Sequence, residues 1–207
     1  MQIKIQKSLK NLTVLILLLS SMSVMAANDF IVARLKGKVT FNGVALKLNQ
    51  KISKGGTLQS SDKSFVSIKS LEFGSNIFLS ANSSLKINDV KDKVPLSLVE
   101  GAVRWVTTKD KTKAKTKTKR VGGIKTKNAV FGVRGTNFAI IYGKLLGESE
   151  IVCFDGKVNF TNQKNTKNTK LITKGQWGGL GGRFGSVITV MDKVPKNVVE
   201  HFDKLLK

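Results

Sequence analysis

The sequence has few of the residues from which catalytic and metal sites are built. It contains one cysteine, Cys153, and one histidine, His201, in 207 residues. One cysteine excludes an intramolecular disulfide, and the two residues together offer little for a zinc site or for a Ser-His-Asp or Cys-His catalytic set. No pair of acidic residues lies in a context typical of general acid–base catalysis. We therefore expect a protein that is not an enzyme and has no cofactor.

Acidic residues are also scarce. Asp and Glu number 13 against 36 Lys and Arg, which gives a formal net charge of +23. Such a balance bears on solubility and on partners rather than on fold. It favours contact with polyanions, namely nucleic acid, anionic lipid head groups or acidic cell-surface polymers.

The longest apolar run lies at the N-terminus, where residues 1–26 are typical of a secretory signal peptide. Lys4, Lys7 and Lys10 precede an apolar stretch from Leu12 to Leu19, and Ala26 suits the last position before cleavage. The stretch is shorter than the ~20 residues that a spanning helix needs, although an uncleaved anchor is an alternative. We expect export to the periplasm or cell surface.

Residues 30–90 consist of short strand-like segments separated by turns. Asn42-Gly43 is a strong two-residue hairpin signal, with a return strand predicted over Val44–Leu48. Turns recur every ~8–12 residues, which is the rhythm of an all-β sandwich, barrel or β-solenoid. No long stretch here has helical periodicity, so crossover helices are not expected.

Residues 192–207 contain the one helix that the sequence predicts. Pro195 suits its start, and the apolar residues fall on one face. They are Val198, Val199, Phe202, Leu205 and Leu206. We interpret it as a capping helix over an open end or edge of the β fold, with a partner-binding or membrane-surface helix as the alternative.

Two other features invite a chemical interpretation. Five glycines fall between Trp177 and Gly185, but no Gly-Lys-Ser/Thr follows, so a phosphate-binding loop is not indicated. We predict a flexible connector to a last strand over Val187–Met191. Cys153 lies in an apolar, β-prone run and is interpreted as a small buried residue rather than a reactive thiol.

A lysine-rich segment spans residues 109–127. From 109 to 119 a lysine occupies every odd position, so an extended chain would carry these side chains on one side. One hypothesis is a binding arm for a phosphate or carboxylate polymer, and the other is a solvated loop between two strands. The basic residues are Lys109, Lys111, Lys113, Lys115, Lys117, Lys119, Arg120, Lys125 and Lys127.

Directly after this segment, two β-prone segments meet at a Gly-Val-Arg-Gly-Thr corner. Gly132 and Gly135 are expected to allow a sharp turn or bulge. Arg134 between them would need a carboxylate or several carbonyls if it points inward. We interpret it as a structural residue, with a ligand-facing role as the alternative.

The spacing T-x-x-A-x-x-G-V-R-G-T-x-F resembles the hallmark of the FecR domain family. It is carried by Thr126, Ala129, Gly132, Val133, Arg134, Gly135, Thr136 and Phe138. Weaker steps extend the resemblance over about residues 30–178, with a departure at Phe73, where the family commonly has Asp. The resemblance implies an all-β domain, a short-strand β-solenoid or sandwich-like module, over residues 27–191.

In the best-known members this domain is the periplasmic part of a membrane-anchored sigma regulator. Because a leader begins this chain, we expect the module and its binding character without the sigma-regulator role. The first hypothesis is an envelope protein that binds another, unknown envelope protein. The second is a polyanion binder that acts through residues 109–127, and the third and weakest is an enzyme.

Overall fold

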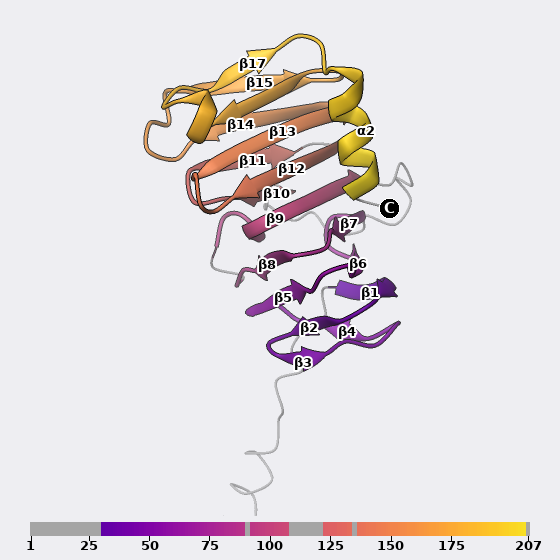
Figure 1. The fold of residues 1–207 in the computed structure, drawn as a ribbon. Helices are drawn as coiled ribbons and strands as arrows, with labels where there is room; N and C mark the ends of the chain where they lie inside the picture. Colours follow the sequence, from indigo (N-terminus) through magenta and orange to yellow (C-terminus); the bar gives the residue numbers. More distant parts are fainter. Residues whose placement is uncertain (1–29, 90–91, 108–121, 134–135, 206–207) are drawn as a thin grey trace, which may run out of the picture.

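The computed structural model describes residues 30–89, 92–107, 122–133 and 136–205, with the backbone alone for residues 203–205. Short strands make up most of this part of the chain, in agreement with the predicted all-β class (Figure 1). The predicted signal peptide, Arg134, Gly135 and most of the lysine-rich segment lie outside the described residues.

The strands form two layers, which we call sheet A and sheet B. Sheet A runs in the order β4 (Lys51–Ile52), β1 (Phe30–Lys36), β6 (Phe65–Ser70), β7 (Ser75–Leu79), β9 (Leu96–Thr107), β12 (Asn137–Gly143), β13 (Glu148–Asp155), β16 (Trp177–Leu180) and β17 (Thr189–Met191). Sheet B runs in the order β3 (Val44–Ala45), β2 (Val39–Phe41), β5 (Gly56–Ser60), β8 (Ser83–Ile87), the start of β9, β10 (Gly122–Lys125), β11 (Ala129–Val133), β14 (Lys157–Asn162) and β15 (Thr169–Thr173).

The long strand β9 joins the two layers. Its first residues pair with β8 in sheet B, and the residues from Gly101 onward pair with β12 and β7 in sheet A. Gly101 has a φ of 92° at this change of sheet, a conformation that favours glycine. Beyond β9 the chain adds one hairpin to each sheet in turn, so that the strands stack along one axis (Figure 1).

The core lies between the two sheets. Alternation along β12 shows this directly, because Phe138, Ile140 and Tyr142 belong to the inner cluster whereas Ala139 belongs to a second cluster on the outer face. The ring of Trp105 is buried and stacks on Phe138 at 6.4 Å between centroids. One continuous apolar cluster thus extends through the stack.

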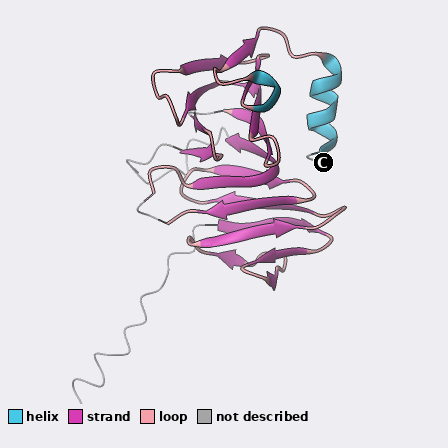
Figure 2. Ribbon diagram, turned by 60° about the vertical axis from the view of Figure 1, so that its left-hand side comes forward, coloured by secondary structure: helices cyan, strands magenta, loops and turns pink. Residues whose placement is uncertain are grey.

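The predicted C-terminal helix is present as α2 (Lys196–Leu205) and stands beside the stack in Figure 2. Its Phe202 is buried against Ala139 and Val152, on the outer face of sheet A. We expected it at an edge or end, but apolar side chains on the outer face of β12, β13 and β16 need cover from water. Among the described residues, no helix has the length and apolar character to cross a bilayer.

The glycine-rich segment differs from the prediction of a flexible connector. Trp177–Leu180 forms strand β16, which pairs with β13 and β17, and Gly182–Phe184 forms a 3₁₀ turn, η1. A Cβ at Gly179 would lie 2.3 Å from the ring of Phe184. Glycine is therefore required so that this ring can lie against the strand. The last strand is shorter than predicted, Thr189–Met191.

Candidate anion-binding and docking surface

The turn between β10 and β11 is held by a buried polar network. Thr126 Oγ1 lies 2.7 Å from Ser149 Oγ and 3.0 Å from Asn128 Oδ1, and the Ala129 N–H donates to Thr126 Oγ1 at 3.1 Å. The hydroxyl of Ser149 also donates to Asn128 Oδ1. The hydroxyl protons of Thr126 and Ser149 are thus shared among the three contacts that join these two hydroxyls and Asn128 Oδ1. Loss of either hydroxyl leaves a buried hydrogen-bond donor or acceptor without its partner.

The same network ties the turn in sheet B to neighbouring turns. The side-chain amide of Asn128 donates to the carbonyl of Gly147 in the β12–β13 turn at 2.8 Å and to that of Leu180 in β16 at 3.2 Å. The amide of Gln163, which follows β14, donates to the carbonyl of Ala129 at 3.2 Å. The β10–β11 turn, the β12–β13 turn and the end of β16 are thereby fixed side by side.

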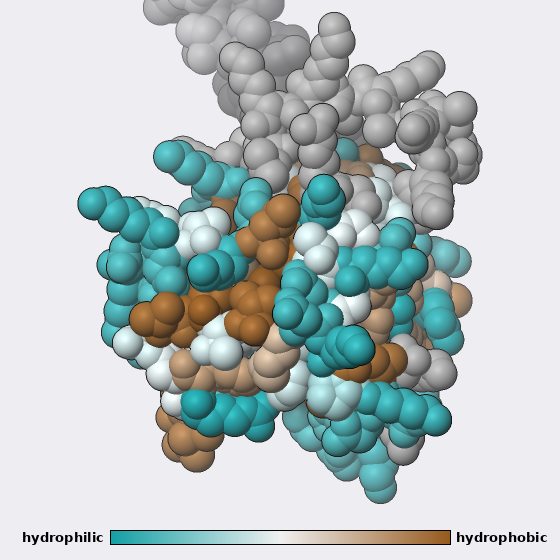
Figure 3. All heavy atoms as spheres, turned by 90° about the horizontal axis from the view of Figure 1, so that it is seen from above, coloured by the Kyte–Doolittle hydropathy of each residue, from teal (hydrophilic) through white to brown (hydrophobic). Residues whose placement is uncertain are grey.

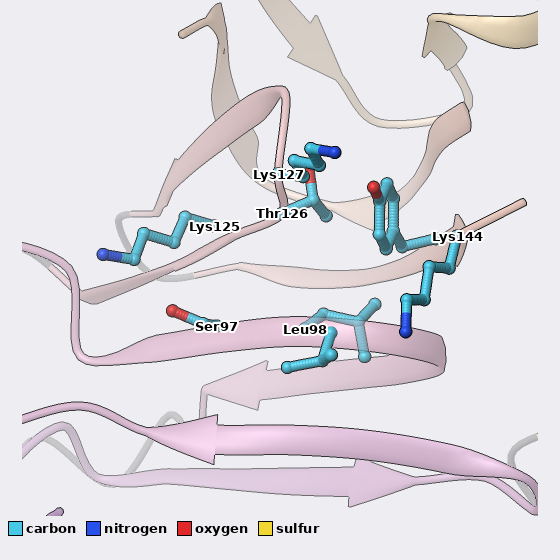
Figure 4. Close-up of a pocket in the computed structure, with 8 residues that line it drawn as sticks. Ser97, Leu98, Lys125, Thr126, Lys127 and Lys144 are labelled. Atoms are coloured by element: carbon cyan, nitrogen blue, oxygen red, sulfur yellow. The ribbon is translucent and has the colours of Figure 1, made fainter. Parts of the chain in front are cut away.

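Two adjoining cavities open at these turns. The first has a volume of about 370 Å³ and is shown in Figure 4; its lining includes Ser97, Leu98, Lys125, Thr126, Lys127, Tyr142 and Lys144. The second has a volume of about 720 Å³, shares Lys127, Tyr142 and Lys144, and extends to Leu145, Leu146, Lys164 and Val187. Burial raises the pKa of Tyr142, so its phenol stays neutral at pH 7.

The electrostatics of this surface favour an anion. Lys127, Lys144 and Lys164 are exposed and come from three different turns, whereas Lys125 Nζ lies 3.7 Å from Asp92 Oδ1. None of the described residues that line the two cavities is an aspartate or a glutamate. Like charges gathered without counter-charges raise the local positive potential, which attracts anionic ligands and surfaces.

A separate polar group lies on the outer face of sheet A. Arg183 Nη2 lies 2.8 Å from Glu150 Oε2, which also accepts from Trp177 Nε1 at 3.1 Å, and the Arg183 N–H donates to Glu148 Oε2 at 2.9 Å. Burial raises the pKa of Glu150, while the Arg183 guanidinium opposes that rise. These contacts anchor η1 to the sheet beside a hollow of about 600 Å³ that the exposed His201 of α2 also lines.

The structure describes two of the nine predicted basic residues, Lys125 and Lys127. Lys125 ends β10 and Lys127 lies in the turn after it, whereas Gly122, where the description resumes after position 121, begins the strand. Both lysines line the first cavity with Lys144, and Lys127 also lines the second cavity with Lys144 and Lys164. Sequence reasoning did not select Lys144, because only the alternation of hairpins between the sheets brings its turn beside residue 127. Lys109, Lys111, Lys113, Lys115, Lys117, Lys119 and Arg120 lie outside the described residues.

The motif residues that are described have structural positions. Val133 and Phe138 belong to the core, and Thr126 and Thr136 are buried. Gly132 differs from the prediction of a turn or bulge, because it lies within β11 and pairs with Gly123 and Asn159 on either side. The interpretation of Arg134 stays a prediction, since Arg134 and Gly135 fall outside the described part.

Cys153 is a buried residue, as predicted. Burial raises the pKa of its thiol to about 11, so the reactive thiolate is scarce at neutral pH. Within the described part of the chain, no three His, Cys, Asp or Glu side chains are grouped as metal ligands.

Comparison with known proteins gives a family and a fold. Residues 57–159 match the model of the family described as FecR protein. Two crystal structures of a candidate anti-sigma factor from Parabacteroides distasonis ATCC 8503, at 1.65 Å and 2.50 Å resolution, each share 13% identity with a TM-score of 0.53. The alignment covers 69% of this chain and 62% of that one, so the chain spans less than two thirds of their length. A comparison with curated proteins gave no match.

Proposed function

The chain carries a FecR domain, and from that premise we propose that it is an exported, non-enzymatic sensing or regulatory module that binds another protein of the cell envelope. The family match over residues 57–159 is the observation that carries the proposal. The fold it shares with the candidate anti-sigma factor from Parabacteroides distasonis supports a regulatory role. The N-terminal leader pattern supports export.

A binding role also suits the side chains. The thiol of Cys153 is buried and protonated, and the carboxylates of Glu148 and Glu150 are occupied by Arg183 and Trp177. In contrast, the lysine-bordered cavities at the turns offer an exposed, rigid surface on which a partner can rest.

Site-specific photo-crosslinking of the full chain in intact cells tests this proposal. A photoreactive residue is placed at Lys127, Lys144, Lys196 and Glu200, on two faces of the described molecule, and at Lys51 in the N-terminal part. We expect one envelope protein to be captured from positions on one face and not from Lys51. Recovery of the chain in the cytosol with residues 1–26 intact, or equal capture from every position, would contradict the proposal.

A second candidate function is polyanion binding through residues 109–127, favoured by the lysines that gather around the cavities. Deletion of residues 109–124 would remove most of β10, so substitution is the cleaner test. Lys→Gln changes at 109, 111, 113, 115, 117 and 119 are compared with the same change at Lys127, Lys144 and Lys164.

Retention of the full chain on heparin, DNA and cell-wall polymer is measured against salt. For a binding arm, log K falls linearly with log salt, and loss of each phosphate contact reduces the slope by roughly 0.7–0.9. If the six-lysine variant keeps the slope of the parent chain, the arm does not bind.

A further inference from the structure

We propose that the β12–β13 turn, the β10–β11 and β14–β15 turns and the loop before β17 form a docking surface for an anionic lipid bilayer. We call it the Leu145–Leu146 surface, and its residues all line the larger cavity. They are Lys127, Lys144, Leu145, Leu146, Lys164 and Val187.

The apolar part of this surface is open to water. Leu145 is 96% exposed, Leu146 is 67% exposed and Val187, from the loop before β17, is 57% exposed. Single exposed apolar residues are ordinary, but two adjacent leucines at a turn, with a valine of another loop at the same cavity, make a patch that suits an interface. Neither leucine belongs to an apolar cluster of the core.

The charged part lines the same cavity as the apolar part. Lys127, Lys144 and Lys164 come from three turns, and Glu148, which follows the β12–β13 turn, is engaged by Arg183. Lysines attract anionic head groups, while protruding leucines enter the boundary between head groups and acyl chains. A bilayer accepts both without a pocket shaped for the leucines, which an acidic protein partner would have to supply.

The surface is held in place before any contact is made. Asn128 fixes the β10–β11 turn to Gly147 at 2.8 Å. The loop that carries Val187 is bound on both sides, because Asn162 Nδ2 donates to the Ser186 carbonyl at 3.1 Å and the Ile188 N–H donates to Asn168 Oδ1 at 3.0 Å. A preorganised surface loses little conformational entropy on docking. Figure 3 views the molecule from the β15–β17 end of the stack. On that face, groups of apolar residues are bordered by hydrophilic residues.

Co-sedimentation of the full chain with vesicles tests the proposal. Phosphatidylcholine vesicles are compared with vesicles that also contain phosphatidylglycerol, using L145Q/L146Q and K127Q/K144Q/K164Q. We expect binding only to the anionic vesicles, a loss of at least tenfold for the double leucine variant, and roughly a fivefold loss per lysine removed. The matched control is K47Q/L48Q/K51Q, which changes exposed residues of the same kinds near β4 and should bind like the parent chain.

A second readout separates a bilayer from other partners. Leu145→Trp should be quenched by brominated acyl chains in anionic vesicles. The surface is not a membrane site if this quenching is absent, if the leucine variant binds vesicles and heparin like the parent, or if the leucines are instead needed for self-association in solution. The inference is independent of the proposed protein partner, because crosslinking in cells can succeed whether or not vesicles bind.

Discussion

At the scale of single residues, Gly101 and Gly132 carry different structural demands. Gly101 has a φ of 92°, and a Cβ there would lie 2.7 Å from the backbone Cα of Ser83. Gly132 lies in β11, and a Cβ there would meet nothing nearer than Asn159 Cβ at 3.9 Å. We therefore predict that Gly101→Ala lowers the free energy of unfolding by more than about 2 kcal/mol, whereas Gly132→Ala changes it by less than about 1 kcal/mol.

Urea unfolding of both variants followed by tryptophan fluorescence checks this difference. Equal effects of the two substitutions would show that the passage of β9 between the sheets does not depend on the backbone conformation at residue 101.

The hydroxyl of Thr126 is the second residue whose role can be measured. Thr126→Val keeps the shape of the side chain but removes the hydroxyl that contacts Ser149 and Asn128. We predict a loss of about 1–3 kcal/mol in the free energy of unfolding, since buried polar atoms lose a partner. Thr126→Ser, which keeps the hydroxyl, serves as the control. Thermal unfolding followed by circular dichroism compares the two, and a larger loss for Thr126→Ser than for Thr126→Val would mean that the methyl group, not the hydroxyl, matters.

At the scale of elements, the contact between η1 and sheet A makes stability depend on pH. Burial raises the pKa of Glu150 above its ordinary value of 4.5. The folded chain therefore holds this proton more tightly than the unfolded chain, so stability falls as pH rises from about 4.5 through the folded pKa. Glu150→Gln removes that fall and still offers an oxygen to Trp177 Nε1.

We predict that the stability of Glu150→Gln relative to the parent chain increases between about pH 4 and pH 8. Urea unfolding at a series of pH values measures it. Glu200→Gln on α2 is the control, because Glu200 is exposed and its Oε1 lies 4.0 Å from Lys196 Nζ at the surface. A pH-independent difference for Glu150→Gln would contradict the raised pKa.

Elements with strong local signals could be predicted from the sequence. Asn42 and Gly43 have φ values of 51° and 81°, as a two-residue hairpin turn requires, and the amphipathic pattern after Pro195 located α2. The return strand predicted over Val44–Leu48 is shorter, Val44–Ala45. Strand β16 was not predicted because its glycines have low strand propensity. The strand is defined by its pairing with β13 and β17, which is a long-range contact that the local sequence does not show.

The candidate surface was accessible from the sequence only in part. The lysine-rich segment pointed to Lys125 and Lys127, but the location of Lys144 beside them depends on which hairpins face each other. The local sequence does not show which hairpins face each other in the folded chain. The position of α2 on a sheet face likewise depends on apolar residues such as Val152 that alternate outward along β13.

At the scale of the whole molecule, the continuous core predicts one cooperative unfolding transition. The inner cluster extends from Phe30 in β1 to Ile188 near β17 without a break at β9. Stacked repeats that contact only their neighbours can unfold in parts, but a shared core between two layers couples the halves. We therefore expect the N-terminal and C-terminal strands to open at the same urea concentration.

Thiol labelling reports each half separately. Cys153 reports the C-terminal half, because its thiol is buried and its pKa is raised to about 11, so iodoacetamide reacts only after opening. Val66, fully buried in β6, reports the N-terminal half through Val66→Cys in a Cys153→Ala background. The urea midpoint of labelling at each thiol is compared with the midpoint of the tryptophan fluorescence transition of the same variant. If the two midpoints coincide in both variants, the whole stack unfolds as one cooperative unit. If the thiol introduced at residue 66 is labelled at a urea concentration where Cys153 stays protected, the stack divides at β9. Among the described strands, β9 is the one that pairs with both the earlier and the later strands.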